Sequence, residues 1–258
     1  MHTFDHPTTV SADLAPLADH PWARGTHRDA TARLVALGWV PCGVGDWAVG
    51  LRSPSGHLAA RVCPFDPAYA AFLDLCQRCA GNPYLPRVER AEALAGGGTL
   101  TVMEFLTPVD KAVALAVQHH WSERPTSVPQ SVTSDASAPR GAAVDAAALL
   151  PEIAGDPDFA AVHEAAQHVN AAYRQNTPWW DGIDLNEGNV RRALDGRLTL
   201  IDVFCMDGAS LYAQVLADAH VVRERMGEEH TRHLLDIPYI ARASTPEEIA
   251  ALRRAWAR

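Results

Sequence analysis

The feature that most constrains the fold of this chain is a polar loop followed by a short hairpin. The loop reads Asp184-Leu-Asn-Glu-Gly-Asn189, and Asp202 follows directly after the apolar run Leu198–Ile201. Between them, Asp195-Gly196 is a strong signal for a tight hairpin turn. Antiparallel pairing places the start of one strand beside the end of the other, about 5 Å away. We therefore expect Asn189 and Asp202 to be neighbours.

These residue types match the needs of phosphoryl transfer. One carboxylate, that of Asp184, would orient or deprotonate an attacking hydroxyl group. The amide oxygen of Asn189 and the carboxylate of Asp202 are hard ligands that would hold Mg²⁺ against nucleotide phosphates. The alternative is an ordinary polar turn in which Asp184 and Asn189 shape the loop and Asp202 ends a strand.

At these residues the chain resembles the protein-kinase-like superfamily, which includes protein kinases, aminoglycoside phosphotransferases and small bacterial and phage kinases. Asp184 matches the catalytic Asp, Asn189 the metal-binding Asn, and Asp202 the second metal-binding Asp. Two departures are Gly182-Ile183 before the catalytic Asp and Val203-Phe204 after the metal Asp. The resemblance, which covers roughly residues 38 to 215, implies an α+β fold of two lobes. The N-lobe would be a small antiparallel sheet and the C-lobe mainly helical.

The same resemblance assigns a nucleotide-binding role to residues nearer the N-terminus. Gly43 and Gly45 lie in a glycine-rich turn between two expected strands, where backbone N–H groups can approach phosphates. Arg61 stands on a third strand, at the position where kinases carry a Lys. No Glu occurs between Arg61 and Glu89, so Asp74 is the candidate anionic partner for this cation. A surface Arg and a solvated Asp are the alternative.

A later strand would lead into the segment that joins the two lobes. Met103 is expected to line the nucleotide pocket, and the backbone near Glu104 to Leu106 is expected to bind adenine. A Met in an apolar strand is also typical of an ordinary core, so this assignment depends on the fold.

The pattern along the chain predicts an irregular N-terminal extension over residues 1–27, an N-lobe over 28–105 and a C-lobe over 106–258. A segment rich in Ser, Pro and Thr, residues 122–142, is typical of a flexible loop. The catalytic loop spans residues 184–189. Helices are expected over residues 28–37, 66–79, 109–121, 158–176, 211–226 and 246–256.

Composition excludes several classes of function. A net charge of −9 argues against bulk nucleic-acid binding, and no apolar run is long enough for a membrane span. Five Cys, without a signal peptide, indicate a reducing cytoplasm. A zinc site at Cys76-x-x-Cys79 would need Cys42 or Cys63 to join it, and buried thiols are the simpler interpretation.

The function predicted from these features is an ATP-dependent, Mg²⁺-requiring phosphotransferase that acts on a hydroxyl group of a small molecule or a protein. Arg61 and the missing helix Glu favour an alternative, a pseudokinase that binds nucleotide or a partner without turnover. A third possibility is an unrelated scaffold in which the motif occurs by chance.

Overall fold

The computed structural model describes residues 6–123, 153 and 155–258 of the chain. They form two compact units, and each is described by itself below. Unit 1 comprises residues 1–67, 87–105 and 207–258, and unit 2 comprises residues 68–86 and 106–206. The expected flexible loop at 122–142 lies, apart from its first two residues, outside the described residues. Within the described part of the chain, no helix has the length and apolar character needed to cross a membrane.

Unit 1 contains a five-stranded sheet with the order β1-β2-β3-β5-β4, in which every neighbouring pair is antiparallel. Its outer strand β4 alternates half-buried and exposed residues, as expected of a sheet edge with one covered face. The predicted α+β class with a small antiparallel sheet is therefore confirmed. The strands are β1 (Val40–Val44), β2 (Val49–Arg52), β3 (Leu58–Cys63), β4 (Val88–Ala93) and β5 (Thr99–Glu104).

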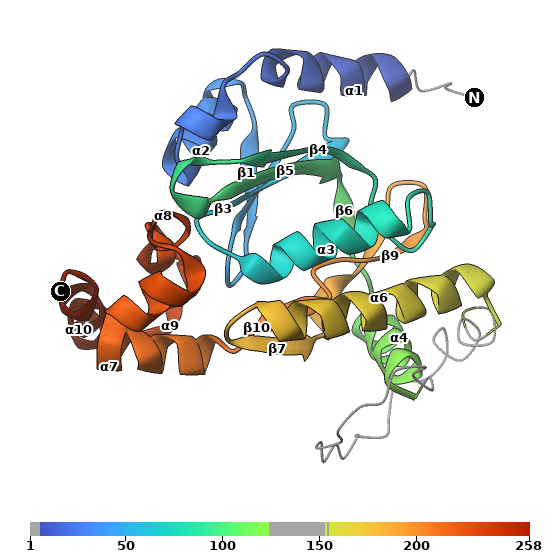
Figure 1. Ribbon diagram of the computed structural model, residues 1–258. Helices are drawn as coiled ribbons and strands as arrows, with labels where there is room; N and C mark the ends of the chain where they lie inside the picture. Colours follow the sequence, from blue (N-terminus) through green and yellow to red (C-terminus); the bar gives the residue numbers. More distant parts are fainter. Residues whose placement is uncertain (1–5, 124–152, 154) are drawn as a thin grey trace. The chain divides into compact units, whose positions relative to one another are not determined.

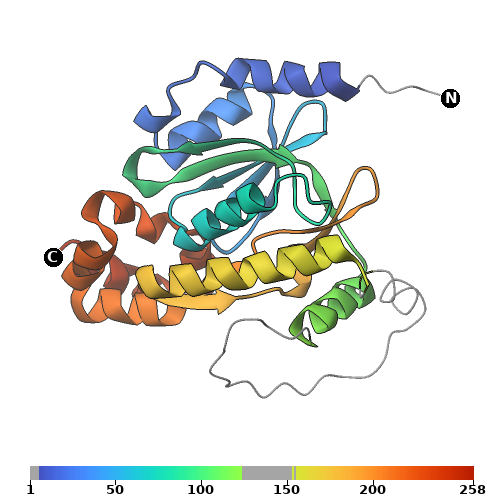
Figure 2. The same cartoon turned by 45° about the vertical axis from the view of Figure 1, so that its right-hand side comes forward.

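Helix α2 (His27–Ala36) contacts strands β3 and β5 (Figures 1 and 2). It begins with a capping box, in which the Thr26 hydroxyl accepts from the Asp29 N–H and the Asp29 carboxylate accepts from the Thr26 N–H. Its apolar side joins the sheet in one hydrophobic core, whose members are Leu17, Trp22, Ala30, Leu34, Trp39, Leu51, Leu58, Ala60, Val62, Leu94, Leu100 and Val102.

The N-terminal extension is less irregular than expected. Residues His6–Leu14 form helix α1, and two short 3₁₀ turns follow, η1 (Ala15–Leu17) and η2 (Trp22–Arg24). Leu17 and Trp22 are buried, and the Trp22 indole N–H donates to the Leu17 carbonyl oxygen at 3.0 Å. This extension therefore belongs to the core of unit 1, which its weak hydrophobic periodicity did not indicate.

The C-terminal residues 207–258 group with the N-terminal sheet, whereas the sequence led us to expect them in a C-lobe. They form α7 (Gly208–Met226), α8 (Glu228–Thr231), η5 (Leu234–Asp236), α9 (Pro238–Ala243) and α10 (Pro246–Trp256). Part of the contact is made by the turn η3 (Ala95–Gly97) between β4 and β5. The Gly96 N–H donates to the Glu229 carboxylate at 3.0 Å. A Cβ at Gly97 would lie 1.9 Å from the His230 carbonyl oxygen, so only glycine permits this approach.

The same C-terminal residues also hold the glycine-rich turn between β1 and β2. The Tyr239 N–H donates to the Asp46 carbonyl oxygen at 2.8 Å, and the Arg242 guanidinium pairs with the Asp46 carboxylate. Arg242 also donates to the Val44 carbonyl oxygen at 3.4 Å. The turn is thus anchored by residues that are remote in sequence.

Unit 2 consists of helices and two small antiparallel sheets. Its helices are α3 (Pro67–Arg78, whose first residue belongs to unit 1), α4 (Lys111–Glu123) and α6 (Pro157–Asn176). One sheet has the order β6-β8-β9 and the other pairs β10 with β7. The strands are β6 (Leu106–Pro108), β7 (Trp180–Ile183), β8 (Val190–Ala193), β9 (Leu198–Leu200) and β10 (Phe204–Met206), and the turn η4 (Glu187–Asn189) precedes β8. Helix α6 runs along β7 in both ribbon views.

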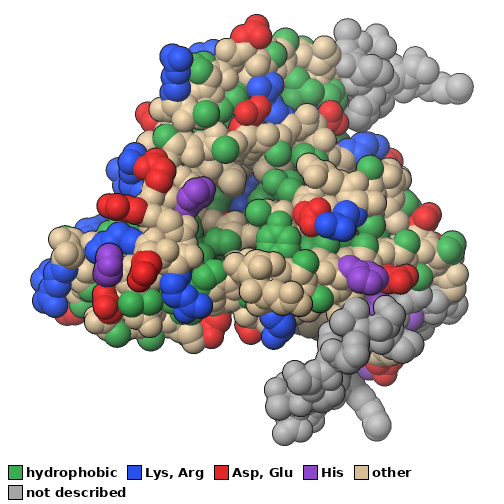
Figure 3. Space-filling model, viewed as in Figure 1, with side chains coloured by type: hydrophobic (Ala, Val, Ile, Leu, Met, Phe, Trp, Pro, Cys, Tyr) green, Lys and Arg blue, Asp and Glu red, His purple; other side chains and the backbone are tan. Residues whose placement is uncertain are grey.

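Charged side chains of both signs are interspersed over the face shown in Figure 3. Consequently, the net charge of −9 does not mark out a single acidic surface on that face.

Candidate functional site

The segment from Asp184 to Asp202 forms a compact arrangement within unit 2. Strand β7 ends just before Asp184, and β10 begins two residues after Asp202 and pairs with β7. Between them, β8 and β9 form the predicted hairpin, with Gly196 at φ 94° in its turn. The hairpin brings Asn189 and Asp202 together, as the sequence predicted.

Asn189 is the centre of this arrangement. Its side-chain amide donates to the carbonyl oxygen of Asp184 at 3.0 Å and to that of Asp202 at 2.9 Å. Its own carbonyl oxygen accepts from the Ile201 N–H at 2.8 Å. The Asn189 side chain therefore links the three residues of the predicted motif, Asp184, Asn189 and Asp202.

The two acceptors also fix the orientation of the Asn189 amide. A carbonyl oxygen only accepts hydrogen bonds, so the Asn189 atom that faces both of them is the NH₂ group. The Asn189 Oδ1 atom accepts no hydrogen bond from the described residues. It remains available as a hard oxygen donor for a cation such as Mg²⁺.

Asp202 adopts a backbone conformation that is uncommon outside glycine. Its φ is 49°, in the left-handed region, which Asp and Asn tolerate better than other residues. The chain turns sharply here, after β9 and before β10, and the residue is half-buried. A strained backbone at this position is consistent with a site in which the carboxylate must take one particular direction.

Asp184 is exposed, and its Oδ2 atom accepts from the Asn186 amide at 3.1 Å. Asn186 in turn accepts from the Gly188 N–H at 2.8 Å, so its side chain both caps η4 and orients the Asp184 carboxylate. Sequence reasoning did not single out Asn186. The sequence signal for its role is an Asn two positions before a Gly, because an Asn side chain often accepts a hydrogen bond from the backbone N–H two residues further on.

Buried aromatic residues pack beside the loop. Trp180 packs against Phe204 with ring centroids 5.6 Å apart, and its indole N–H donates to Asn170 at 2.8 Å. Gly182 has a φ of 135°, and a Cβ there would lie 2.9 Å from Arg174. The backbone conformation at this position, two residues before Asp184, therefore requires glycine.

Cys205 lies close to this site but is not suited to act as a nucleophile. Burial, together with the negative charges of Asp181 and Asp184, raises the pKa of its thiol to about 12. The thiolate is the reactive form of Cys, so this group stays protonated at neutral pH. None of the five cysteines belongs to a metal-capable cluster of three or more His, Cys, Asp or Glu in the part of the chain that is described.

The residues expected to contact the nucleotide are distributed over both units. Gly43 and Gly45 lie in unit 1, at the end of β1 and just after it, and both are exposed. A Cβ built on Gly43 has no heavy atom within 4 Å, so this strand end is open to solvent or a ligand.

Arg61 lies on β3 as predicted, and the structure pairs it with Asp66. The Arg61 side chain is 14% exposed and that of Asp66 is 2% exposed, so the pair is well shielded from water. Asp74, the partner expected from the sequence, pairs with Arg78 at 2.9 Å on the surface of α3. Asp66 was overlooked because it directly precedes Pro67, where it resembles an ordinary residue at a helix start.

The chain passes from unit 1 to unit 2 between Phe105 and Leu106. Met103 is buried in β5, and the Glu104 carboxylate pairs with Arg87 at 2.8 Å. The N–H groups of Glu104 and Phe105 are already donated, to the carbonyl oxygens of Arg87 and His57. A purine docking on this segment would therefore need other backbone groups, such as the Glu104 carbonyl or N–H groups from Leu106 onward.

Two solved structures similar to this chain are of aminoglycoside phosphotransferases. One, aminoglycoside phosphotransferase APH(3'')-Id from Streptomyces rimosus ATCC10970, has 17% sequence identity and a TM-score of 0.34, and the match covers 90% of this chain and 99% of that chain. The other, a GDP complex of a mutant aminoglycoside 2'-phosphotransferase-IIIa, has 15% identity and a TM-score of 0.33, covering 97% and 86%. No protein-family model and no curated protein matches the sequence. Similarity this low does not assign a function, so the proposal below depends on the Asp184–Asp202 geometry.

Proposed function

We propose that this chain is a phosphotransferase that moves the γ-phosphoryl group of ATP to a hydroxyl group of a small molecule or a protein. The observation that carries the proposal is the double hydrogen bond from the Asn189 amide to Asp184 and Asp202. It links two carboxylate-bearing residues through the side chain that also carries the amide oxygen. Positioning and electrostatics are what phosphoryl transfer chiefly requires of a protein.

The roles follow from exposure and donor chemistry. Asp184 is the exposed carboxylate, so it would accept a hydrogen bond from the acceptor hydroxyl and orient it. Asn189 Oδ1 and the Asp202 carboxylate are the residues that would hold Mg²⁺, which supplies charge neutralisation at the phosphates when bound. Both donors are hard oxygen atoms, so the residues present fit this ion.

The nucleotide side of the proposal uses Gly43, Gly45 and Arg61, with Asp74, Met103, Glu104 and Leu106 as further candidates. Open space above Gly43 is compatible with phosphate oxygens approaching the backbone.

The shielded Arg61–Asp66 pair supports a second candidate function. If Asp66 neutralises the cation, Arg61 has less charge to offer to phosphates, and the chain would bind nucleotide or a partner without turnover. This is the pseudokinase interpretation.

Incubation of the purified chain with γ-labelled ATP or GTP tests both candidates. Transfer of label to an aminoglycoside, to another hydroxyl compound or to a protein, dependent on Mg²⁺, is the result expected of the phosphotransferase. Nucleotide binding in calorimetry without turnover under any of these conditions would support the pseudokinase instead. Absence of both would leave the loop as a structural turn and overturn the proposal.

A further inference from the structure

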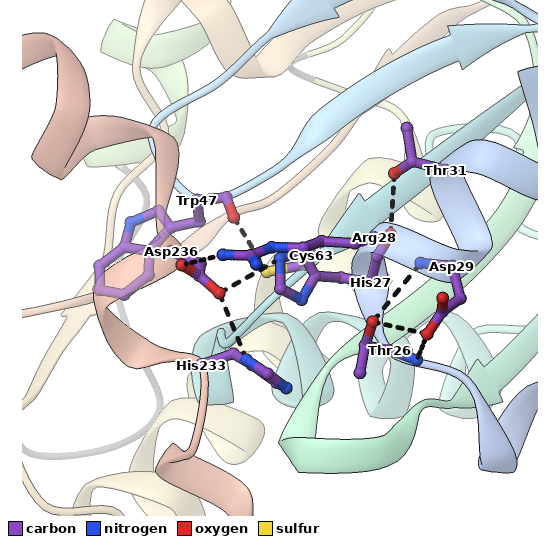
Figure 4. A network of polar contacts seen from close by, with 9 residues as sticks. All are labelled: Thr26, His27, Arg28, Asp29, Thr31, Trp47, Cys63, His233 and Asp236. Carbon is purple, nitrogen blue, oxygen red and sulfur yellow. Dashed lines mark hydrogen bonds and ion pairs between the residues drawn. The ribbon is translucent and has the colours of Figure 1, made fainter.

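A cluster of two His and one Asp lies in unit 1, away from the Asp184–Asp202 segment in the sequence. His27 is the first residue of α2, and His233 and Asp236 flank and end η5 (Figure 4). One ligand atom from each of the three side chains lies within 4.8 Å of the others. In the described residues, this is the only such group of three or more His, Cys, Asp or Glu.

The distances within the cluster fit a shared metal ion. The Asp236 Oδ2 atom lies 3.5 Å from His27 Nε2 and 3.2 Å from His233 Nδ1. An ordinary N–H···O hydrogen bond is shorter, about 2.9–3.0 Å. Two ligands bound tetrahedrally at about 2.0–2.1 Å from one zinc ion would be roughly 3.4 Å apart.

The surroundings of the cluster hold these atoms in place. Arg28 donates to the other carboxylate oxygen of Asp236 at 2.8 Å, which leaves Oδ2 directed at the two imidazoles. The side chains of His27, His233 and Asp236 are 12%, 18% and 28% exposed, so water can complete the coordination. Gly96 leaves room for the His233 ring, because a Cβ there would lie 2.4 Å from it.

We propose that His27, His233 and Asp236 bind one Zn²⁺-class cation that ties the start of α2 to the C-terminal residues. Imidazole suits zinc and cobalt, whereas Mg²⁺ prefers oxygen ligands, so this site is distinct in chemistry from the one proposed at Asn189 and Asp202. The outer nitrogens, His27 Nδ1 and His233 Nε2, have no hydrogen-bond partner in the described structure. Affinity will therefore be lower than in zinc sites whose His ligands donate to a second partner.

The test uses the full chain without a polyhistidine tag, stripped of metal by a chelator. Titration with Co²⁺ should give one equivalent of bound ion with the intense visible absorption of tetrahedral cobalt, and Zn²⁺ should displace it. Mg²⁺ should not compete. Zn²⁺ at about 100 times its Kd should raise Tm by roughly 5–10 °C.

Substitutions of the three proposed ligands test where the ion binds. His233→Asn and His27→Asn should each weaken binding at least about 100-fold, since removal of a ligand exceeds the effect of losing a supporting partner. Asp236→Asn serves the same purpose if either His variant fails to fold. His119→Ala, which removes an exposed His, and the Cys76→Ser, Cys79→Ser double variant should bind as the parent does.

Three results would overturn the proposal. The first is no saturable Co²⁺ or Zn²⁺ binding to the parent chain. The second is undiminished binding to folded His27, His233 or Asp236 variants, which would mean an adventitious ion. The third is loss of binding in the double Cys variant, or a thiolate charge-transfer band in the cobalt spectrum. The outcome does not depend on whether the chain transfers phosphate.

Discussion

The Asp184–Asp202 segment and the glycine-rich turn between β1 and β2 are held in place in different ways. In the first, the hydrogen bonds of Asn189 join residues at most 13 positions apart, and strand β6 adds a pairing with β8. In the second, Asp46 and Val44 are contacted by Arg242, 196 and 198 positions further along the chain. The contacts of Asn189 are local in sequence, whereas the turn depends on the C-terminal helices. A change in those helices should therefore affect the turn and leave the Asp184–Asn189 loop intact.

The largest expected effect is on the chemistry proposed for the Asp184–Asp202 segment. Asp184→Asn should lower turnover by about 10²–10⁴-fold, because the acceptor hydroxyl loses its orienting base. Stability in urea should change little, since the side chain is exposed. Asp181→Asn, which removes a neighbouring exposed carboxylate, is the matched control and should keep near-parental turnover. An unchanged rate in Asp184→Asn would remove the role proposed for it.

Arg61→Ala tests the cation on β3. It leaves the Asp66 carboxylate shielded and without this cation, and should lower the free energy of unfolding by about 3 kcal/mol. The Arg61→Ala, Asp66→Ala double variant should recover part of that stability. If Arg61 contacts nucleotide, ATP binding stays weak in the double variant, and Arg61→Lys retains some of it. Parental affinity in the double variant would assign Arg61 a structural role only.

Asn189→Asp tests how much the Asn189 amide contributes to holding the Asp184–Asp202 segment together. The substitution keeps a potential metal ligand but removes both N–H donors, so the carbonyl oxygens of Asp184 and Asp202 lose their partner. The free energy of unfolding should fall by about 2 kcal/mol. Asn176→Asp, an exposed Asn on α6, should stay within about 0.5 kcal/mol of the parent. Equal effects in the two variants would show that the Asn189 amide is dispensable for folding.

Arg242→Ala probes the remote support of the turn. The pair with Asp46 is about half exposed, so its loss should cost at most about 1 kcal/mol of stability. The KM for nucleotide should rise by up to about fivefold with kcat unchanged, because the turn becomes less ordered. Arg232→Ala, which breaks a similarly exposed pair with Glu229, should leave KM unaltered. If both variants shift KM equally, the turn is not specifically held by Arg242.

The smallest effect is expected for the only Lys in the chain. Lys111 pairs with Glu187 of η4 at 2.9 Å, but both side chains are exposed. Lys111→Ala should change the free energy of unfolding by less than about 0.5 kcal/mol and leave turnover near the parental value. A loss of turnover comparable to that of Asp184→Asn would place Lys111 in the site.

The features that could be predicted from the sequence involve residues that lie close together in the chain. The adjacency of Asn189 and Asp202 follows from a turn signal and an apolar run within twenty residues, and the main helices follow from apolar periodicity. The partner of Arg61 could not be predicted in this way, because both Asp66 and Asp74 follow it in the sequence and only the tertiary structure decides between them. The contact of His27 with Asp236 was equally hidden, because no periodicity or spacing links residues so far apart.

Unit 1 is built from three separate stretches of the chain, and this limits when it can fold during synthesis on the ribosome. Unit 2 is complete once residue 206 has emerged, but unit 1 still lacks residues 207–258. At about 5–20 residues per second, roughly 5–20 s pass between the synthesis of residue 105 and the start of those helices at residue 207. Throughout that interval the His27 side chain and the glycine turn at Gly96–Gly97 would be without their later partners. Nascent chains halted before residue 230 should therefore be more susceptible to proteases and chaperones in the strands of unit 1 than in the Asp184–Asp202 hairpin.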